Sequence, residues 1–116
     1  MSDLAYIYLL QDGHDKGTRV YKIGRTVQKG GDSRKLDGLQ AYSNGTIVYY
    51  LWKVNVTVVN AIKTAIKQEF KQHYRIARGY EWFEGDVKGM NNIINTVIDL
   101  MDIRETYTPS NPQNTL

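Results

Sequence analysis

Two short runs rich in tyrosine and branched aliphatic residues constrain the fold more than any other feature of this chain. The first run is Ala5–Leu10 (AYIYLL), and the second is Val20–Thr26 (VYKIGRT). The segment between them holds Gln11–Gly17, which is rich in residues that favour turns. Two aromatic and β-branched runs around such a segment predict a β-hairpin. A hairpin with tyrosine, lysine and arginine on its faces can present a hydroxyl group and two cations to a phosphate.

The segment after the hairpin predicts a loop, a short helix and a third strand. A glycine-containing loop precedes Asp32 and Ser33, either of which can cap a helix that runs to about Ala41. The stretch Thr46–Val56 is rich in valine, isoleucine, tyrosine and tryptophan, which is typical of a strand.

Residues 58–74 predict a longer helix, because an apolar residue recurs at every fourth position. A second row with the same spacing is cationic, and Arg75 and Arg78 continue it after Lys63, Lys67 and Lys71. Together with Arg25 and Arg34, this row can line a groove for a nucleic-acid backbone. The alternative interpretation is a solvated surface with chance clustering of charge.

The last third of the chain predicts a short strand and a final helix. Glu81–Phe83 forms the extended piece, and Asp86 caps a helix with an apolar stripe from Met90 to Met101. The predicted order is strand, strand, helix, strand, helix, short strand, helix. This order gives an α/β protein of the α+β kind, with a small, mainly antiparallel three-stranded sheet flanked by helices.

Length and composition favour one small domain inside the cell. The 116 residues predict a domain over residues 1–104, followed by a polar, disordered tail over residues 105–116. Without cysteine, neither a disulfide framework nor a thiolate metal site can form. No apolar run approaches the roughly 20 residues that span a bilayer, and the start lacks the pattern of a signal peptide. We therefore expect a soluble, intracellular protein with no membrane partner.

Positive charge is unevenly distributed along the chain. The formal net charge is only +3, yet residues 16–35 contain seven basic residues and a single acid, Asp32. The acids gather in residues 81–105. A one-sided basic surface suits a polyanion, so we expect DNA as the partner, with RNA as an alternative.

The order of these pieces resembles the GIY-YIG nuclease superfamily, over roughly residues 4 to 100. The most similar branch is the T5orf172 type of phages and large DNA viruses. Tyr6–Tyr8 matches the first motif, Lys22–Thr26 the second, and Arg34 the arginine of the following helix. Tyr80–Gly85 matches the segment after the long helix. The resemblance implies an intracellular location in a host, in the cytoplasm or the nucleus.

The resemblance also implies catalytic roles for three residues. In the family, a tyrosine from each of the first two strands and the helix arginine act on the phosphodiester. Tyr8 would orient water or phosphate, and Arg34 would stabilise the transferring charge. Lys22 stands where the second motif usually has a tyrosine, and it would act on the water or bind phosphate. Each of the three has an ordinary structural alternative, as a strand tyrosine, a strand lysine or a solvated helix arginine.

The metal-binding position departs from the family pattern. The glutamate that would hold Mg²⁺ or Mn²⁺ falls on Lys63, and a lysine cannot ligate a hard cation. Glu69 lies six residues later, about 120° around the helix, and Glu81 lies on the extended segment. Either glutamate is a candidate ligand, and Glu81 has the alternative role of a structural hydrogen-bond partner.

Three functional hypotheses follow from these residues. The first is a nucleic-acid-binding protein that acts as a metal-dependent DNA endonuclease. The second is a catalytically silent GIY-YIG-like module that binds nucleic acid or a protein and serves a virus or mobile element. The third is a structural interaction domain. The sequence does not predict the oligomeric state.

Overall fold

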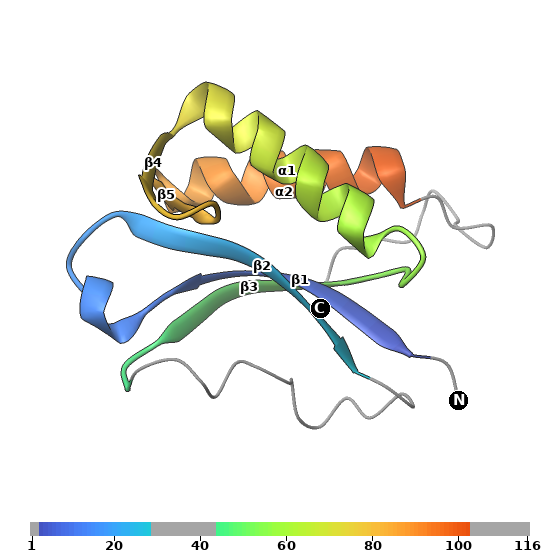
Figure 1. Ribbon diagram of the computed structural model, residues 1–116, viewed down its shortest axis with the longest axis horizontal. Helices are drawn as coiled ribbons and strands as arrows, with labels where there is room; N and C mark the ends of the chain where they lie inside the picture. Colours follow the sequence, from blue (N-terminus) through green and yellow to red (C-terminus); the bar gives the residue numbers. More distant parts are fainter. Residues whose placement is uncertain (1–2, 29–43, 103–116) are drawn as a thin grey trace.

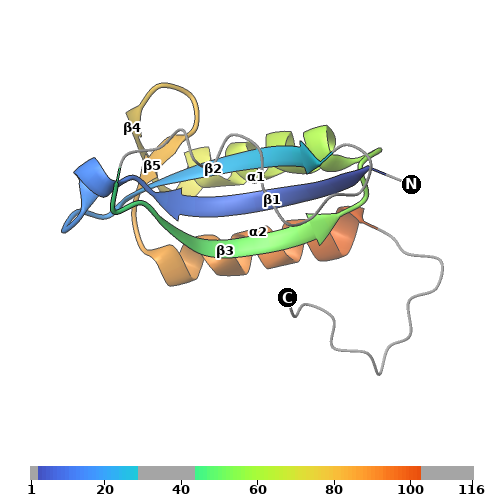
Figure 2. The ribbon, with the colours of Figure 1, turned by 90° about the horizontal axis from the view of Figure 1, so that it is seen from below.

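The computed structural model describes residues 3–28 and 44–102, and its centre is a five-stranded antiparallel sheet. The strand order is β3-β1-β2-β5-β4. The strands are β1 (Leu4–Gln11), β2 (Val20–Gln28), β3 (Ile47–Val54), β4 (Arg75–Arg78) and β5 (Trp82–Glu84). Two helices, α1 (Val59–His73) and α2 (Val87–Met101), lie side by side on one face of the sheet (Figure 1). Seen through the sheet, α1 runs behind β2 and α2 behind β3 (Figure 2).

The α+β class and the antiparallel sheet are confirmed, but the predicted number of strands is wrong. The described part of the chain contributes five strands to a sheet for which three were expected, and the short extended piece predicted at Glu81–Phe83 is one of the two added strands, β5. The predicted helix to Ala41, its arginine Arg34 and the predicted tail 105–116 lie outside the described residues.

The predicted hairpin is confirmed, and its register places the motif residues next to one another. β1 pairs with β2 so that Tyr8 lies opposite Gly24 and Ile7 opposite Arg25. The connecting segment contains a short 3-10 helix, and the Asp12 carboxylate accepts a hydrogen bond of 3.0 Å from the backbone N–H of His14. Since side chains alternate along a strand, Tyr8 and Gly24 share one face, and Ile7 and Arg25 share the other.

The core lies between the sheet and the two helices. Alternate residues of β1 face the helices, and they are Ala5, Ile7 and Leu9. The apolar ridges of both helices pack onto them, through Val59, Ile62, Ile66, Phe70, Met90 and Ile94. This burial explains the fourth-residue spacing of the predicted long helix, because that spacing keeps apolar side chains on one helical face.

The long helix ends earlier than its apolar spacing predicts. α1 stops at His73, and Tyr74 is extended, with φ −133° and ψ 151°. Its ring packs so tightly against Gly85 and Gly89 that a Cβ atom on either glycine would overlap it. Arg75 therefore begins β4, and the arginines predicted to continue the cationic row of the helix lie on a strand instead.

The final helix begins as predicted. The Asp86 carboxylate accepts a hydrogen bond of 2.9 Å from the backbone N–H of Gly89 and caps α2. Halfway along the helix, the Asn95 side chain accepts a 2.8 Å hydrogen bond from the indole N–H of Trp52 on β3. The hydrogen bond between Trp52 and Asn95 ties α2 to the β3 side of the sheet. Neither helix in the described ranges 3–28 and 44–102 is long and apolar enough to cross a membrane.

Candidate functional site

A carboxylate held between two lysines lies at the edge of β2, where the short strand β5 begins. Glu81 directly precedes β5, and its backbone carbonyl accepts a 3.0 Å hydrogen bond from the N–H of Ile23. Its side chain forms an ion pair with Lys63 of α1 through Oε2. Its other oxygen, Oε1, lies 3.6 Å from Nζ of Lys22 on β2. The sheet and the helix thus each bring one ammonium group to the same carboxylate.

A third lysine adds to the positive charge at this edge. Lys67 lies one helical turn after Lys63, and its charge also acts on Glu81. We call Lys22, Lys63 and Lys67 the lysine cluster. With Glu81 the group carries three positive charges and one negative charge, a net of +2. Lys71 is exposed one turn further along α1. The cationic row predicted for the helix is therefore present from Lys63 to Lys71.

The first motif lies on the sheet face opposite the helices. Tyr8 alternates with the core residues Ile7 and Leu9, and its ring lies directly over Gly24. Only 5% of Tyr8 is exposed. Lys22 shares this face, since it pairs with Leu10 two residues along β1. Gly24 is required here because its missing side chain leaves the space that the phenol ring fills.

Most of the chain matches one known protein family. Residues 5–98 match the T5orf172 domain. The chain belongs to the T5orf172 family. This family is GIY-YIG-like, which confirms the resemblance to the GIY-YIG superfamily and supports a nuclease-like, nucleic-acid-binding domain. No curated protein and no solved structure matches the chain.

Within this T5orf172 domain, the close approach of Tyr8 to Gly24 gives a stability prediction. Gly24→Ala would place a methyl group inside the space of the Tyr8 ring. Overpacking of this kind costs about 1–3 kcal/mol of unfolding free energy. Urea denaturation measures this loss. The matched control makes the same change in a Tyr8→Leu background, where the phenol is absent and the cost should shrink. An equal cost in both backgrounds would contradict the contact.

The lysines keep Glu81 ionised despite its partial burial. Burial raises the pKa of Glu81, but the hydrogen bond from Lys63 and the charges of Lys63, Lys22 and Lys67 lower it more. The net effect is a pKa below the ordinary value of 4.5. The carboxylate is therefore a fixed negative charge at neutral pH.

This lowered pKa predicts a pH dependence of folding. A carboxyl group with a depressed folded pKa stabilises the fold above its unfolded pKa and loses that contribution as the pH falls through the folded value. We expect the unfolding free energy of the native chain to fall below pH 4.5 more steeply than that of Glu81→Gln. Denaturation at a series of pH values measures both curves. Parallel curves would show that Glu81 does not contribute in this way.

The residues around Glu81 do not fit the divalent cation that the GIY-YIG resemblance implies. Mg²⁺ binds oxygen ligands, and several of them must converge on it. Both oxygens of Glu81 already face ammonium groups, from Lys63 and Lys22. Over the described ranges, no three histidine or acidic side chains come together as a metal site would require.

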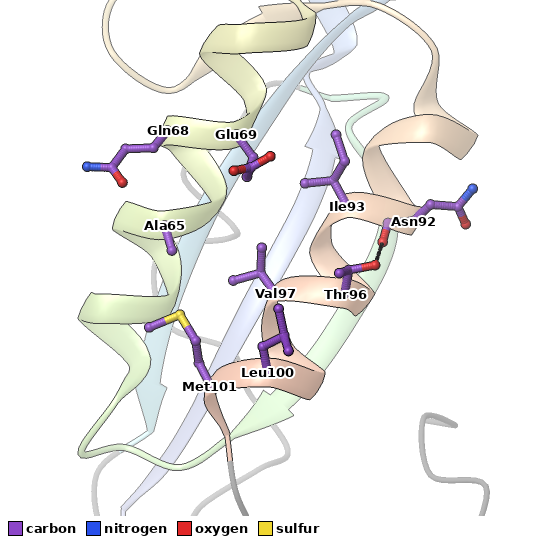
Figure 3. Close-up of a pocket in the computed structure, with 9 residues that line it drawn as sticks. All are labelled: Ala65, Gln68, Glu69, Asn92, Ile93, Thr96, Val97, Leu100 and Met101. Atoms are coloured by element: carbon purple, nitrogen blue, oxygen red, sulfur yellow. Dashed lines mark hydrogen bonds between the residues drawn. The ribbon is translucent and has the colours of Figure 1, made fainter.

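The other predicted ligand, Glu69, lies elsewhere on α1. Its carboxylate is 3.9 Å from Nε2 of His73. It borders a groove of about 490 Å³ between the two helices, as Figure 3 shows. The apolar lining of this groove includes Ala65, Ile93, Val97, Leu100 and Met101. Glu69 thus faces α2, whereas Lys63 faces Glu81 beside β5, and the fold does not bring Glu69 to the lysine cluster.

The two arginines of β4 form ion pairs within the domain. Arg75 donates a 2.9 Å hydrogen bond through Nε to Glu84 on β5. Arg78 makes two hydrogen bonds, of 3.2 and 2.7 Å, to the carboxylate of Asp15. Its guanidinium group also stacks 4.0 Å from the centre of the Trp82 ring. Both arginines therefore have a structural role, in addition to the nucleic-acid contact predicted for them.

Glu81 and all three lysines are candidate site residues in the sequence, but the sequence does not predict that they form one site. Lys22 and Glu81 meet because β5 pairs with β2 only over Val20–Lys22. That register connects residues 59 positions apart, since 81 minus 22 is 59. The only signal in the sequence was the opposite charge of Glu81 and the lysines. Charge alone does not specify how β5 pairs with β2. Arg25 is exposed further along β2, and Arg34 is not among the described residues.

Proposed function

We propose that this T5orf172 domain binds the phosphate backbone of nucleic acid without cutting it in a metal-dependent reaction. DNA is the proposed partner, with RNA as the alternative. The observation that carries the proposal is the lysine cluster, in which Lys63 and Lys22 pair with the carboxylate of Glu81 and Lys67 adds a third positive charge. The family supports the nucleic-acid-binding part of the proposal.

The lysine cluster has the chemistry that a phosphate needs. An ammonium group donates up to three hydrogen bonds and carries a full charge, so Lys63 can contact a phosphate oxygen while it holds Glu81. Lys67 and Lys71 extend the same charge along α1, in the direction that a backbone could follow. Arg25 on β2, with Arg34 as predicted from the sequence, would extend it on the sheet side.

The alternative hypothesis is an endonuclease that uses Mg²⁺ or Mn²⁺, with Tyr8, Lys22 and Arg34 at the reacting phosphate. Two observations favour binding over cleavage. The carboxylate at the site is engaged by two ammonium groups, which repel a metal ion. Tyr8 is 5% exposed, so its phenol is poorly accessible to a phosphodiester.

The test combines cleavage and binding with the full chain. Supercoiled plasmid, single-stranded DNA and RNA are incubated with the protein and Mg²⁺ or Mn²⁺, and binding is measured over a series of salt concentrations. We expect no nicking, together with an affinity that falls as salt rises, because neutralised phosphates release counterions. Metal-dependent nicking that Tyr8→Phe abolishes would overturn the proposal in favour of the endonuclease.

A matched pair of variants tests whether the lysine cluster is the binding surface. Lys67→Gln should reduce the slope of log affinity against log salt by about one unit. Lys53→Gln removes the same charge from β3, at the far edge of the sheet, and should leave the slope unchanged. If the protein has no affinity for any nucleic acid at low salt, the proposal is wrong, and the alternative of a protein-binding module remains.

A further inference from the structure

We infer that the ammonium group of Lys63 is a built-in cation, which replaces a divalent metal ion in the capture of phosphate at Glu81. This inference rests on the proposed nucleic-acid binding and deepens it. It assigns a metal-independent site for a phosphodiester, built from Lys22, Lys63 and Glu81.

The first argument is the way Glu81 connects two structural elements. Its Oε2 contacts Lys63 from α1, and its Oε1 lies 3.6 Å from Lys22 on β2. A carboxylate that bridges two cations holds them close together, although their charges repel each other. Glu81 is itself fixed, because its backbone carbonyl accepts a hydrogen bond from Ile23. The two ammonium groups are thus positioned before any ligand arrives.

The second argument is burial. The side chains of Lys22, Lys63 and Glu81 are 18%, 19% and 28% exposed. Charges that are partly shielded from water interact more strongly than charges on an open surface. A metal ion entering here would meet two ammonium groups at short range, whereas a phosphate anion would be attracted by both. The site therefore selects an anion over a cation.

The third argument concerns what Lys63 does to the carboxylate. A metal ligand must offer lone pairs, and Lys63 takes one oxygen of Glu81 in a direct ion pair. Lys67 lies one turn further along α1 and acts on the carboxylate through its charge. Lys63 is therefore the residue that decides whether Glu81 can act as a ligand, and Lys67 is its matched control on the same helix.

The test begins with the metal alone. Binding of Mn²⁺ to the full chain, in the absence of nucleic acid, is followed through the electron paramagnetic resonance signal of the free ion. The wild-type chain should bind no Mn²⁺ at the site. Lys63→Glu should gain one bound Mn²⁺, since it brings a second carboxylate beside Glu81. Lys67→Glu makes the same charge change without reaching Glu81 and should gain none. Circular dichroism confirms that each variant folds.

The second measurement uses a fluorescent oligonucleotide. Wild-type affinity should be the same in EDTA and in Mg²⁺ when the ionic strength is held constant. Stoichiometric Mn²⁺ binding by the wild type, or an affinity that rises with Mg²⁺, would overturn the inference, and the wild-type measurements stand even if Lys63→Glu does not fold. Gain of Mn²⁺ by Lys67→Glu, or no gain by a folded Lys63→Glu, would also overturn it.

These results separate the inference from the function it rests on. If the wild type binds neither nucleic acid nor Mn²⁺ while Lys63→Glu gains Mn²⁺, Lys63 excludes the metal but the proposed function is wrong. If the wild type binds nucleic acid only when Mg²⁺ is present, the proposed binding stands and the built-in cation is wrong.

Discussion

Phe70→Ala is expected to lower the free energy of unfolding by about 3–5 kcal/mol, the usual cost of truncating a buried phenylalanine. Phe70 is completely buried where α1 meets the sheet. Its ring makes edge-to-face contacts with Phe83 on β5 and Tyr74, with ring centres 5.3 and 5.4 Å apart. Such pairs add to the stability that comes from burial alone.

The loss is large for a chain of this size. Small domains are stable by about 5–15 kcal/mol in total, so this variant approaches the limit of folding. Urea denaturation followed by circular dichroism measures the change. Leu100→Ala is the control, because Leu100 is 73% exposed on α2 and its truncation should change stability by less than about 0.5 kcal/mol. A Phe70→Ala variant as stable as this control would show that the aromatic contacts are wrong.

Reversing two charges of the lysine cluster should have the largest effect on nucleic-acid binding. In the double variant Lys22→Glu, Lys67→Glu, two attractive contacts with phosphate become two repulsive ones. Each neutralised phosphate contributes about 0.9 to the salt dependence of log affinity. We expect this slope to fall by about two units, and binding at low salt to weaken sharply. Fluorescence anisotropy with a labelled oligonucleotide over a salt series measures both quantities.

A control with the same net charge separates the site from bulk electrostatics. Lys53→Glu with Lys88→Glu also changes the formal net charge by four units, from +3 to −1, but at exposed positions on β3 and α2. The control should keep the slope of the wild type. Equal losses in the two double variants would mean that overall charge, and not the lysine cluster, governs binding.

Local sequence patterns predicted the elements that are long and strongly periodic. The hairpin, the third strand and both described helices are confirmed, because alternation and fourth-residue spacing extend over many residues there. The short strand predicted at Glu81–Phe83 is present as β5 (Trp82–Glu84), whereas β4, four residues long, is too short for a periodic signal and was not predicted. Arg75 and Arg78 continue the spacing of the lysines on α1, so the predicted cationic row ran past the end of the helix at His73. Where the helix ends, the ring of Tyr74 packs against Gly85 and Gly89. This contact depends on the tertiary fold and is not visible in the local sequence.

The candidate site was only partly predictable for a related reason. The residue types that bind phosphate could be recognised in Lys22 and Lys63, and the departure from the metal-binding pattern was visible at Lys63. That Glu81 would lie between these two lysines depends on the pairing of β5 with β2. Pairing of a three-residue strand is set by packing around Phe83, which no local pattern encodes.

The strand order has a consequence for synthesis on the ribosome. β1, β2 and β3 lie within the first 54 residues, whereas β5, which pairs with β2, comes at residues 82–84. A nascent chain that has exposed only its first half therefore carries β2 without β5, and strands without their partners can pair with other chains. The sheet can be completed only after α1 has emerged. Stalled or truncated chains that end before Arg75 should thus aggregate more readily than the full chain.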